Sequence, residues 1–276
     1  MDELDYINSI CLDPSVDKKT RDLMQDGIEN RIRWIKKMLP KGLEILIATE
    51  KPKDEIIHYK WVGKMKHSDL TVYDRVPMGL LEFIPIEFAT EPIKGKDILF
   101  INCVWILPPF WNIGVGKALM TAFIDKVMQN GGGCVISYDG DRWFETSIRY
   151  MPSGFFKKFG FKEVERDGTR VLVYLDAGSS SPPEFLHPNN ESSQENDKIK
   201  IEICYNCQCP WSKFMVNSVT TKLEYQSDVS IKTINTDDRK IIEKLGISRG
   251  VRINGNPIIR RLATWNEIET EIRKIG

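Results

Sequence analysis

A glycine-containing stretch near the middle of the chain has the composition of a phosphate-binding loop. Gly114-Val115-Gly116 follows the proline pair Pro108-Pro109 and precedes a pattern in which apolar residues recur every four positions, as in a helix. A glycine loop at a helix N-terminus presents unpaired backbone N–H groups at the positive end of the helix dipole, without side chains that would keep an anion away. The stretch therefore predicts a site for a phosphate or pyrophosphate group.

The spacing excludes two common classes of nucleotide loop. A dinucleotide-binding fingerprint needs a third glycine three residues after the second, where this chain has Leu119. A P-loop needs Ser or Thr after its lysine, but Lys117 is followed by Ala118. A turn between a strand and a helix also needs glycine for its own geometry, so the loop by itself leaves a purely structural role open.

A second group of residues with chemical potential is Cys204, Cys207 and Cys209, three of the six cysteines. Pro210 suits the first turn of a helix, which places Cys209 near an N-cap, where the helix dipole favours a thiolate. The three thiols could form a redox-active disulfide, hold a soft metal ion or serve only in packing. A closed zinc site needs a fourth ligand, and none is adjacent, so we expect no resident metal.

Strands and helices alternate around these residues. The apolar pattern predicts a helix at 17–39 and a buried strand at 97–106, which ends at the proline pair. The other strands that it predicts lie at 43–49, 61–65, 78–86 and 134–138, with a hairpin of 162–165 and 169–175. The glycine loop is thus expected between a buried strand and a helix.

The composition divides the chain into two parts. Residues 177–198 contain three prolines and many serines and asparagines, which predicts a linker. The pattern after it predicts the order β-α-β-α-β-β-α, with the capping box Thr264-x-x-Glu267 opening the last helix. We expect an α/β (α+β) protein with a first domain at 1–176 and a smaller second domain at 199–276.

Two segments resemble the GNAT acetyltransferase superfamily. Residues 106–119, from Ile-x-Pro to Ile-Gly-Val-Gly-Lys-Ala-Leu, resemble the acyl-CoA loop of that family, written Q/R-x-x-G-x-G/A after a V-x-P strand end. Residues 151–164, MPSGFFKKFGFKEV, resemble its later F-Y-x-K-x-G-F segment. The resemblance implies a mixed sheet with flanking helices and transfer of an acetyl group from acetyl-CoA. It also implies that the cofactor is bound, mainly through backbone groups, by Val104, Ile106, Trp111, Asn112, Ile113, Gly114, Val115, Gly116 and Lys117.

The same resemblance implies a general acid and a general base, and the chain departs from the family at the acid. Phe156 stands where many members have the tyrosine that protonates the leaving thiolate, so Tyr150 is our candidate for that role. For the base we expect Glu82, whose charge interrupts the apolar run MGLLEFIPI and so requires a cleft or a partner, or Asp139 at the end of a strand. Trp111 stands at the Gln/Arg position of the loop, which backbone binding of the pyrophosphate tolerates.

The C-terminal part resembles the thioredoxin fold, which keeps its chemistry between its first strand and first helix. Cys209-Pro210-Trp211-Ser212 is similar to the C-x-x-S of monothiol glutaredoxins. Together the two parts resemble YoaP-type proteins, in which a GNAT domain precedes a thioredoxin-like extension.

The overall composition limits the partners. Lys and Arg number 39 and Asp and Glu also number 39, so no net charge favours nucleic acid or an anionic membrane. No apolar run approaches the ~20 residues of a membrane span, and the acidic start MDELDYINSI is unlike a signal peptide, so we expect a cytoplasmic protein.

Three hypotheses of function follow. The first is transfer of an acetyl group from acetyl-CoA to an amine of a small molecule or peptide, directly and within a ternary complex. The second is a protein that handles disulfides or soft metals through the C-terminal cysteines, with a GNAT half that binds CoA but is weakly catalytic. The third is an acyl-CoA sensor without turnover. The sequence leaves the acceptor and the oligomeric state open.

Overall fold

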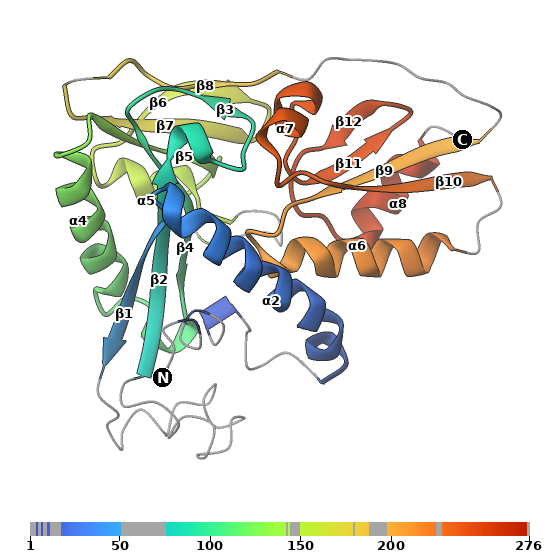
Figure 1. Ribbon diagram of the computed structural model, residues 1–276, viewed down its shortest axis with the longest axis horizontal. Helices are drawn as coiled ribbons and strands as arrows, with labels where there is room; N and C mark the ends of the chain where they lie inside the picture. Colours follow the sequence, from blue (N-terminus) through green and yellow to red (C-terminus); the bar gives the residue numbers. More distant parts are fainter. Residues whose placement is uncertain are drawn as a thin grey trace.

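The computed structural model describes residues 18–50, 76–141, 150–178, 180–187, 198–224 and 228–274, together with Leu4, Ile7, Ile10, Cys11 and Trp143. The strand expected at 61–65 lies outside these residues. Within them the chain forms two large sheets, each with its own hydrophobic core, and a small sheet of two short strands (Figure 1).

The first sheet is mixed, as the sequence predicts, and its strands follow the order β1-β2-β4-β5-β7-β6. All neighbours are antiparallel except β4 and β5, which are parallel. Its strands are β1 (Glu44–Glu50), β2 (Val76–Pro85), β4 (Leu99–Ile106), β5 (Gly132–Tyr138), β6 (Lys162–Asp167) and β7 (Arg170–Asp176).

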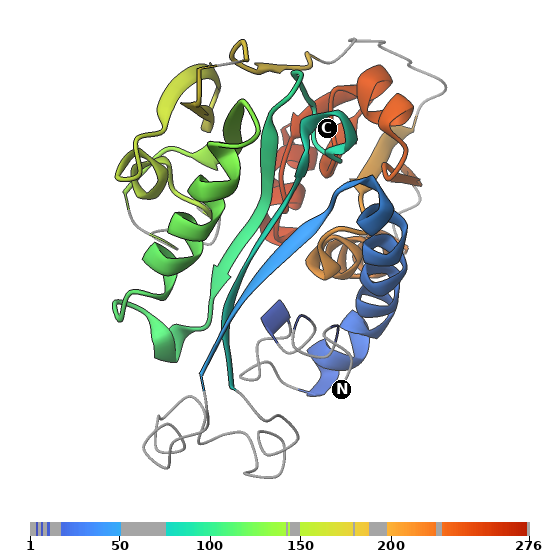
Figure 2. The same cartoon turned by 60° about the vertical axis from the view of Figure 1, so that its left-hand side comes forward.

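Two long helices cover opposite faces of this sheet. Phe83 of β2 makes an edge-to-face ring contact with Phe123 of α4 (Val115–Val127). The preceding residue, Glu82, faces Arg31 of α2 (Lys18–Met38), because successive side chains of a strand point to opposite faces. Figure 2 shows α4 on one side of the sheet and α2 on the other, and the short helix α5 (Ser153–Lys157) precedes β6. The described residues also form the 3₁₀ helices η1 (Leu39–Lys41), η4 (Ile86–Phe88) and η5 (Pro108–Phe110), which connect the larger elements.

The helix predicted at 17–39 is α2, and its buried face includes a charged residue. Leu39, the last residue of the predicted helix, lies beyond α2 and is 52% exposed, whereas Arg31 and Trp34 are buried. The reason is tertiary: Arg31 has a carboxylate partner on β2, so the helix turns a charged residue inward.

The second sheet follows the order β10-β9-β11-β12. Strands β9 and β10 are parallel, and the other neighbours are antiparallel. Its elements are β9 (Ile199–Tyr205), α6 (Pro210–Leu223), β10 (Val229–Asn235), α7 (Arg239–Leu245), β11 (Gly250–Ile253), β12 (Asn256–Ile259) and α8 (Trp265–Arg273). The predicted order β-α-β-α-β-β-α is confirmed, and so is the capping box of Thr264 and Glu267 at the start of α8. That this half is thioredoxin-like stays a prediction.

The segment expected to be a linker contains a short strand. β8 (Glu184–Phe185) pairs with β3 (Ile93–Lys94), and Phe185 is buried in the first core. Residues 188–197 lie outside the described part of the chain.

The two halves are packed against each other. Helix α2 lies alongside α6 (Figure 1), so closely that a Cβ atom on Gly27 would lie 2.6 Å from the backbone oxygen of Pro210. Asn217 of α6 donates a hydrogen bond to the backbone oxygen of Leu23 at 3.3 Å. Among the residues that the structure describes, no helix combines the length and the apolar character needed to span a bilayer.

Candidate active site

The first sheet opens between its two parallel strands. β4 and β5 are paired only at Leu99 with Gly133 and Phe100 with Cys134, after which no pairing joins them. From Ile101 to Ile106 the edge of β4 that faces β5 therefore has no strand partner among the described residues. Backbone groups along such an edge need other partners, and a ligand can supply them.

Two carbonyl groups on this open edge are contacted by aromatic side chains. The backbone oxygen of Val104 accepts a hydrogen bond from Tyr150 Oη at 3.1 Å, and that of Ile106 accepts one from Trp111 Nε1 at 2.7 Å. The next residue, Leu107, instead donates its N–H to Met78 of β2 at 2.9 Å. Because backbone groups alternate in direction along a strand, the backbone groups of Val104 and Ile106 face the opening. The sequence predicts that these two residues bind the cofactor there.

The predicted glycine loop lies at the end of β4 and leads into α4. Gly114 is the N-cap of the helix, with a φ of 93°, in the left-handed region that glycine adopts without strain. No side chain caps this helix end, and its first turn contains no acidic residue. The first N–H groups of α4 are thus left for another acceptor.

The space around the loop fits an extended anionic ligand. A Cβ atom on Gly114 would meet no atom within 4 Å, so the loop is open there, whereas one on Gly116 would lie 3.0 Å from Ile106 Cδ1. Gly116 therefore brings the helix N-terminus against the open edge of β4. A phosphate at the helix end and an amide-bearing chain along the strand would both find backbone partners.

The remaining loop residues predicted to bind the cofactor differ in exposure. Asn112, Ile113 and Lys117 are exposed, and Trp111 is 43% exposed. The Val115 side chain is buried in the core, so only its backbone can contribute.

Tyr150 lies in the opening and shares its hydroxyl with a thiol. Its Oη is 2.7 Å from Cys103 Sγ. Burial raises the pKa of Cys103 and, together with the nearby Cys103 thiol, raises the pKa of Tyr150 well above its ordinary value. Both groups therefore keep their protons at neutral pH, and a consistent arrangement has the thiol donating to Tyr150 while the phenol donates to Val104.

Phe156, at the position of the usual family tyrosine, has no access to the opening. It is fully buried and packs its ring edge-to-face against Phe155 and at 5.9 Å from Phe161. The position therefore serves the core of the first half.

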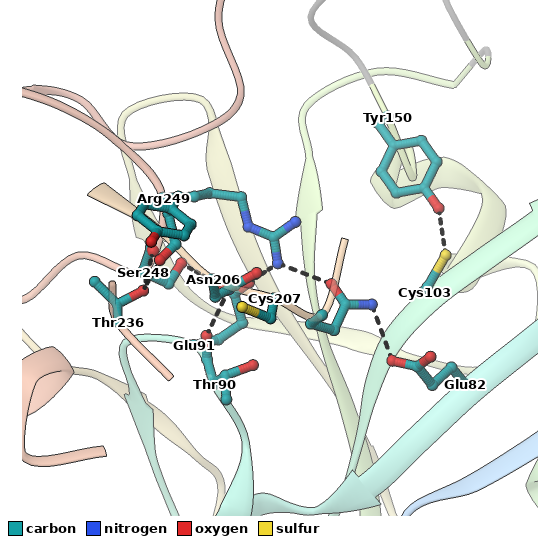
Figure 3. A network of polar contacts seen from close by, with 12 residues as sticks. Glu82, Thr90, Glu91, Cys103, Tyr150, Asn206, Cys207, Thr236, Ser248 and Arg249 are labelled. Carbon is teal, nitrogen blue, oxygen red and sulfur yellow. Dashed lines mark hydrogen bonds and ion pairs between the residues drawn. The ribbon is translucent and has the colours of Figure 1, made fainter. Parts of the chain in front are cut away.

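Glu82 is fully buried beside Cys103, its partner in the register of β2 and β4. Arg31 Nη2 donates to Glu82 Oε2 at 2.8 Å, and Gln208 Nε2 donates to Glu82 Oε1 at 2.9 Å. Figure 3 shows Glu82, Cys103 and Tyr150 on one side of the same polar network. The structure thus brings two of the three predicted catalytic residues to the two sides of Cys103.

Asp139 lies in a different setting. It follows β5, its side chain is 61% exposed, and its Oδ2 is 3.3 Å from Arg166 Nη1. Its backbone N–H donates to the backbone oxygen of Thr169 at 3.0 Å, which ties the end of β5 to the turn between β6 and β7.

The three C-terminal cysteines have three different surroundings. Cys204 is buried on β9, and burial raises its pKa to about 12. Cys207 lies near Asp237, and burial together with that carboxylate raises its pKa to about 12. Cys209 is half-buried and is the N-cap residue of α6, as the sequence predicts. Among the described residues no three His, Cys, Asp or Glu side chains form a group that could hold a metal ion.

Sequence reasoning missed three polar residues of this region. Arg31 had a detectable signal, because the spacing of Ile28, Arg31 and Ile35 puts a charge on the apolar face of the helix. Gln208 and Arg249 had none, since their contacts join segments far apart in the chain.

Comparisons with known proteins agree with this geometry. The model of the acetyltransferase (GNAT) family matches residues 39–161. A curated relative, the uncharacterized N-acetyltransferase YoaP of Bacillus subtilis (strain 168), is 24% identical over 198 residues, which are 68% of this chain and 75% of the relative.

Solved structures of similar proteins include two bound to forms of coenzyme A. The PaiA N-acetyltransferase of Thermoplasma acidophilum in complex with coenzyme A has a TM-score of 0.37 and 13% identity, over 63% of this chain and 92% of that chain. The N-acetyltransferase PseH of Campylobacter jejuni in complex with acetyl coenzyme A has a TM-score of 0.27 and 16% identity, over 48% of this chain and 99% of that chain. Residues 39–161, which contain the open edge of β4, the glycine loop and α4, therefore match the acetyltransferase (GNAT) family, and this match indicates an N-acetyltransferase with acetyl-CoA as its acetyl donor.

Proposed function

We propose that the enzyme transfers the acetyl group directly, within a ternary complex, to an amine of a small molecule or peptide. The observation that carries the proposal is the divergence of β4 and β5, which leaves the edge from Ile101 to Ile106 unpaired beside the N-terminus of α4. One cleft can then hold the donor along β4 while the acceptor approaches the same strand.

In this proposal the donor is bound mainly by backbone groups. The first turn of α4 and its glycine loop bind the pyrophosphate, because their N–H groups have no acceptor within the helix. The open edge of β4 binds the extended part of the donor. The residues proposed for these contacts are Val104, Ile106, Trp111, Asn112, Ile113, Gly114, Val115, Gly116 and Lys117.

Tyr150 is the proposed general acid. Acetyl-CoA supplies a thioester, and its cleavage leaves a thiolate that needs a proton. Tyr150 holds a proton at Oη beside the open edge of β4, and its raised pKa keeps the phenol protonated at neutral pH, so that the proton is present when the thiolate leaves. Cys103 supports the phenol from the other side.

Glu82 is the proposed general base. Each of its oxygens accepts one hydrogen bond, which leaves lone pairs on both, because a carboxylate offers about four acceptor sites. Glu82 pairs with Cys103 of β4, and Tyr150 contacts Cys103 and Val104 of the same strand. Asp139 is the second candidate, and its exposure and its ion pair with Arg166 make it less suited to a water-poor cleft.

The proposal also includes the division of the chain into two domains. We place the acyltransferase domain at 1–176 and a thioredoxin-like domain at 199–276 after the segment 177–198, supported by the two cores and by the order β10-β9-β11-β12. A cytoplasmic location is proposed from composition alone. No observation favours disulfide or metal chemistry at Cys204, Cys207 and Cys209, so that alternative is not proposed.

The experiment that tests the function is a screen of primary amines with the full chain and acetyl-CoA. Formation of CoA and of acetylated amine is followed by mass spectrometry, since six free cysteines would react with thiol reagents. Direct transfer predicts that CoA forms only when an amine is present and in equal amount to the acetylated amine. Rapid release of one equivalent of CoA without an amine would contradict direct transfer, and no product with any amine would contradict the proposed acceptor class.

A further inference from the structure

A buried polar chain connects the acyltransferase strand β2 with the C-terminal half. Gln208 Nε2 donates to Glu82 Oε1 at 2.9 Å, and Gln208 Oε1 accepts from Arg249 Nη2 at 3.2 Å (Figure 3). Arg249 also forms an ion pair with Glu91 in the loop before β3. A single side chain of the second half thus lies between the proposed base and a cation.

The chemistry of its neighbours fixes the orientation of the Gln208 amide. A carboxylate such as Glu82 only accepts hydrogen bonds, and a guanidinium such as Arg249 only donates them. The NH₂ group must therefore face Glu82 and the amide oxygen must face Arg249. Arg31 adds a second restraint, because its Nη1 donates to the backbone oxygen of Gln208.

At its Arg249 end, this series of polar contacts is attached to the first half by several further hydrogen bonds. Ser248 Oγ donates to the second oxygen of Glu91 at 2.5 Å, and Asn206 Nδ2 donates to the backbone oxygen of Thr90 at 3.2 Å. Arg239 donates to the backbone oxygens of Ala89 and Glu91 at 3.0 and 3.1 Å. These hydrogen bonds attach the C-terminal half to the segment before β3. They keep Arg249 within hydrogen-bonding distance of Gln208.

Gln208 and Arg249 lie outside the family match at 39–161, yet Gln208 forms a hydrogen bond with Glu82, which lies within it. We propose that Gln208, oriented by Arg249, is a positioning residue of the acyltransferase site, which holds the carboxylate of Glu82 toward the acceptor. The C-terminal half then completes the acceptor side of the cleft. This inference rests on the proposed role of Glu82 as general base.

The proposal predicts a change in pH dependence. The charged or titratable groups that act on Glu82 are Arg31 from α2, Cys103 from β4 and Cys11. Gln208 adds a neutral donor that favours the ionised carboxylate, so its removal makes ionisation harder. We expect Gln208→Ala to move the acidic limb of kcat/KM for the amine to higher pH by about one unit and to lower kcat roughly tenfold, with KM for acetyl-CoA unchanged.

Two further variants separate positioning from simple packing. Gln208→Glu keeps the side-chain size but brings a second carboxylate beside Glu82, so the acidic limb should move further up than in Gln208→Ala. Asn217→Ala is the matched control, since it also removes a hydrogen bond between the halves, from α6 to Leu23, but far from Glu82. It should leave the pH profile unchanged.

The measurement is the pH profile of steady-state kinetics with full-length proteins, acetyl-CoA and the amines spermidine, glucosamine and trialanine amide. Shifts in both Gln208 variants, with none in Asn217→Ala, support the inference. An active wild type whose Gln208 variants keep its profile and kcat overturns the inference alone. A wild type that acetylates none of the three amines or any other amine of the screen overturns the proposed function and the inference with it.

Discussion

At the scale of single residues, the proton on Tyr150 is the group on which the proposed chemistry depends. The phenol lies between Cys103 Sγ and the backbone oxygen of Val104, at 2.7 and 3.1 Å. Its raised pKa keeps it protonated through neutral pH. Cys103 is half-buried and takes part in this contact.

Tyr150→Phe removes that proton with little change in size. We expect kcat to fall roughly 100-fold, within the range for loss of a general acid, while the Kd for acetyl-CoA changes little, because the donor is bound by backbone groups. Steady-state kinetics and calorimetric titration measure the two quantities. Tyr174→Phe is the control, since the hydroxyl of Tyr174 forms hydrogen bonds with Asp176 at the end of β7 and with Ser180 just after it. A Tyr150→Phe enzyme with full kcat would assign the acid elsewhere.

The cysteines offer a second test at this scale. Cys204 and Cys207 both have a pKa of about 12, so their thiolate fraction at pH 7.5 is roughly a thousandth of that of an ordinary cysteine, or less. Because the thiolate is the reactive form, we expect iodoacetamide to label both slowly at neutral pH, with rates that still rise above pH 9. Mass spectrometry of the native chain measures the rates, and the urea-unfolded chain gives the ordinary rate. Labelling of native Cys207 at the unfolded rate would refute this assignment.

At the scale of elements, a β-bulge decides which residues of β2 and β4 face each other. The register passes from Glu82 opposite Cys103 to Phe83 opposite Ile101, so Asn102 is the extra residue of β4. The apolar pattern predicts both strands within two residues at each end, but it carries no information on a bulge, because a bulge changes pairing and leaves composition unchanged. The pairing of Glu82 with Cys103 could therefore not be predicted from the sequence.

The contact between α2 and α6 gives a prediction at this scale. A Cβ atom on Gly27 would overlap the backbone oxygen of Pro210, which cannot move as a flexible side chain can. We expect Gly27→Val to lower the free energy of unfolding by about 1–3 kcal/mol despite the better helix propensity of valine. Urea unfolding measures the difference, with Asp26→Val, at an exposed neighbouring position, as the control for a β-branched residue in the helix. An unchanged or higher stability of Gly27→Val would mean that the two helices are further apart than described.

At the scale of the whole molecule, the two halves share a polar interface. Gln208 and Arg249 of the second half connect Glu82 and Glu91 of the first half in one chain of contacts (Figure 3). Charged groups removed from water in this way are costly unless each has a partner, so the interface favours one relative placement of the halves. Separate expression of the first half would remove the hydrogen bond from Gln208 and leave Arg31 as the described donor to Glu82.

The elements of each half could be predicted from the sequence better than the contacts between the two halves. The glycine loop, the strand before it and the β-α-β-α-β-β-α order follow from local patterns of apolar residues, glycine and proline. The junction depends on matches between single polar residues more than 100 positions apart, such as Glu82 with Gln208, and no local pattern encodes such a match. For the same reason the glycine loop before α4 could be located from the sequence, whereas the partners of Glu82 could not.

The central claim is that the open edge of β4 and the N-terminus of α4 bind acetyl-CoA. Calorimetric titration of acetyl-CoA into the full-length wild type and into Gly116→Trp tests it most directly. A Cβ atom on Gly116 already meets Ile106 at 3.0 Å, so an indole there would fill the space between loop and strand. Thr121→Trp, on the exposed side of the same helix, controls for the bulk of the side chain. The account predicts micromolar binding to the wild type and to Thr121→Trp and none to Gly116→Trp, whereas equal binding to all three, or binding to none, would contradict it.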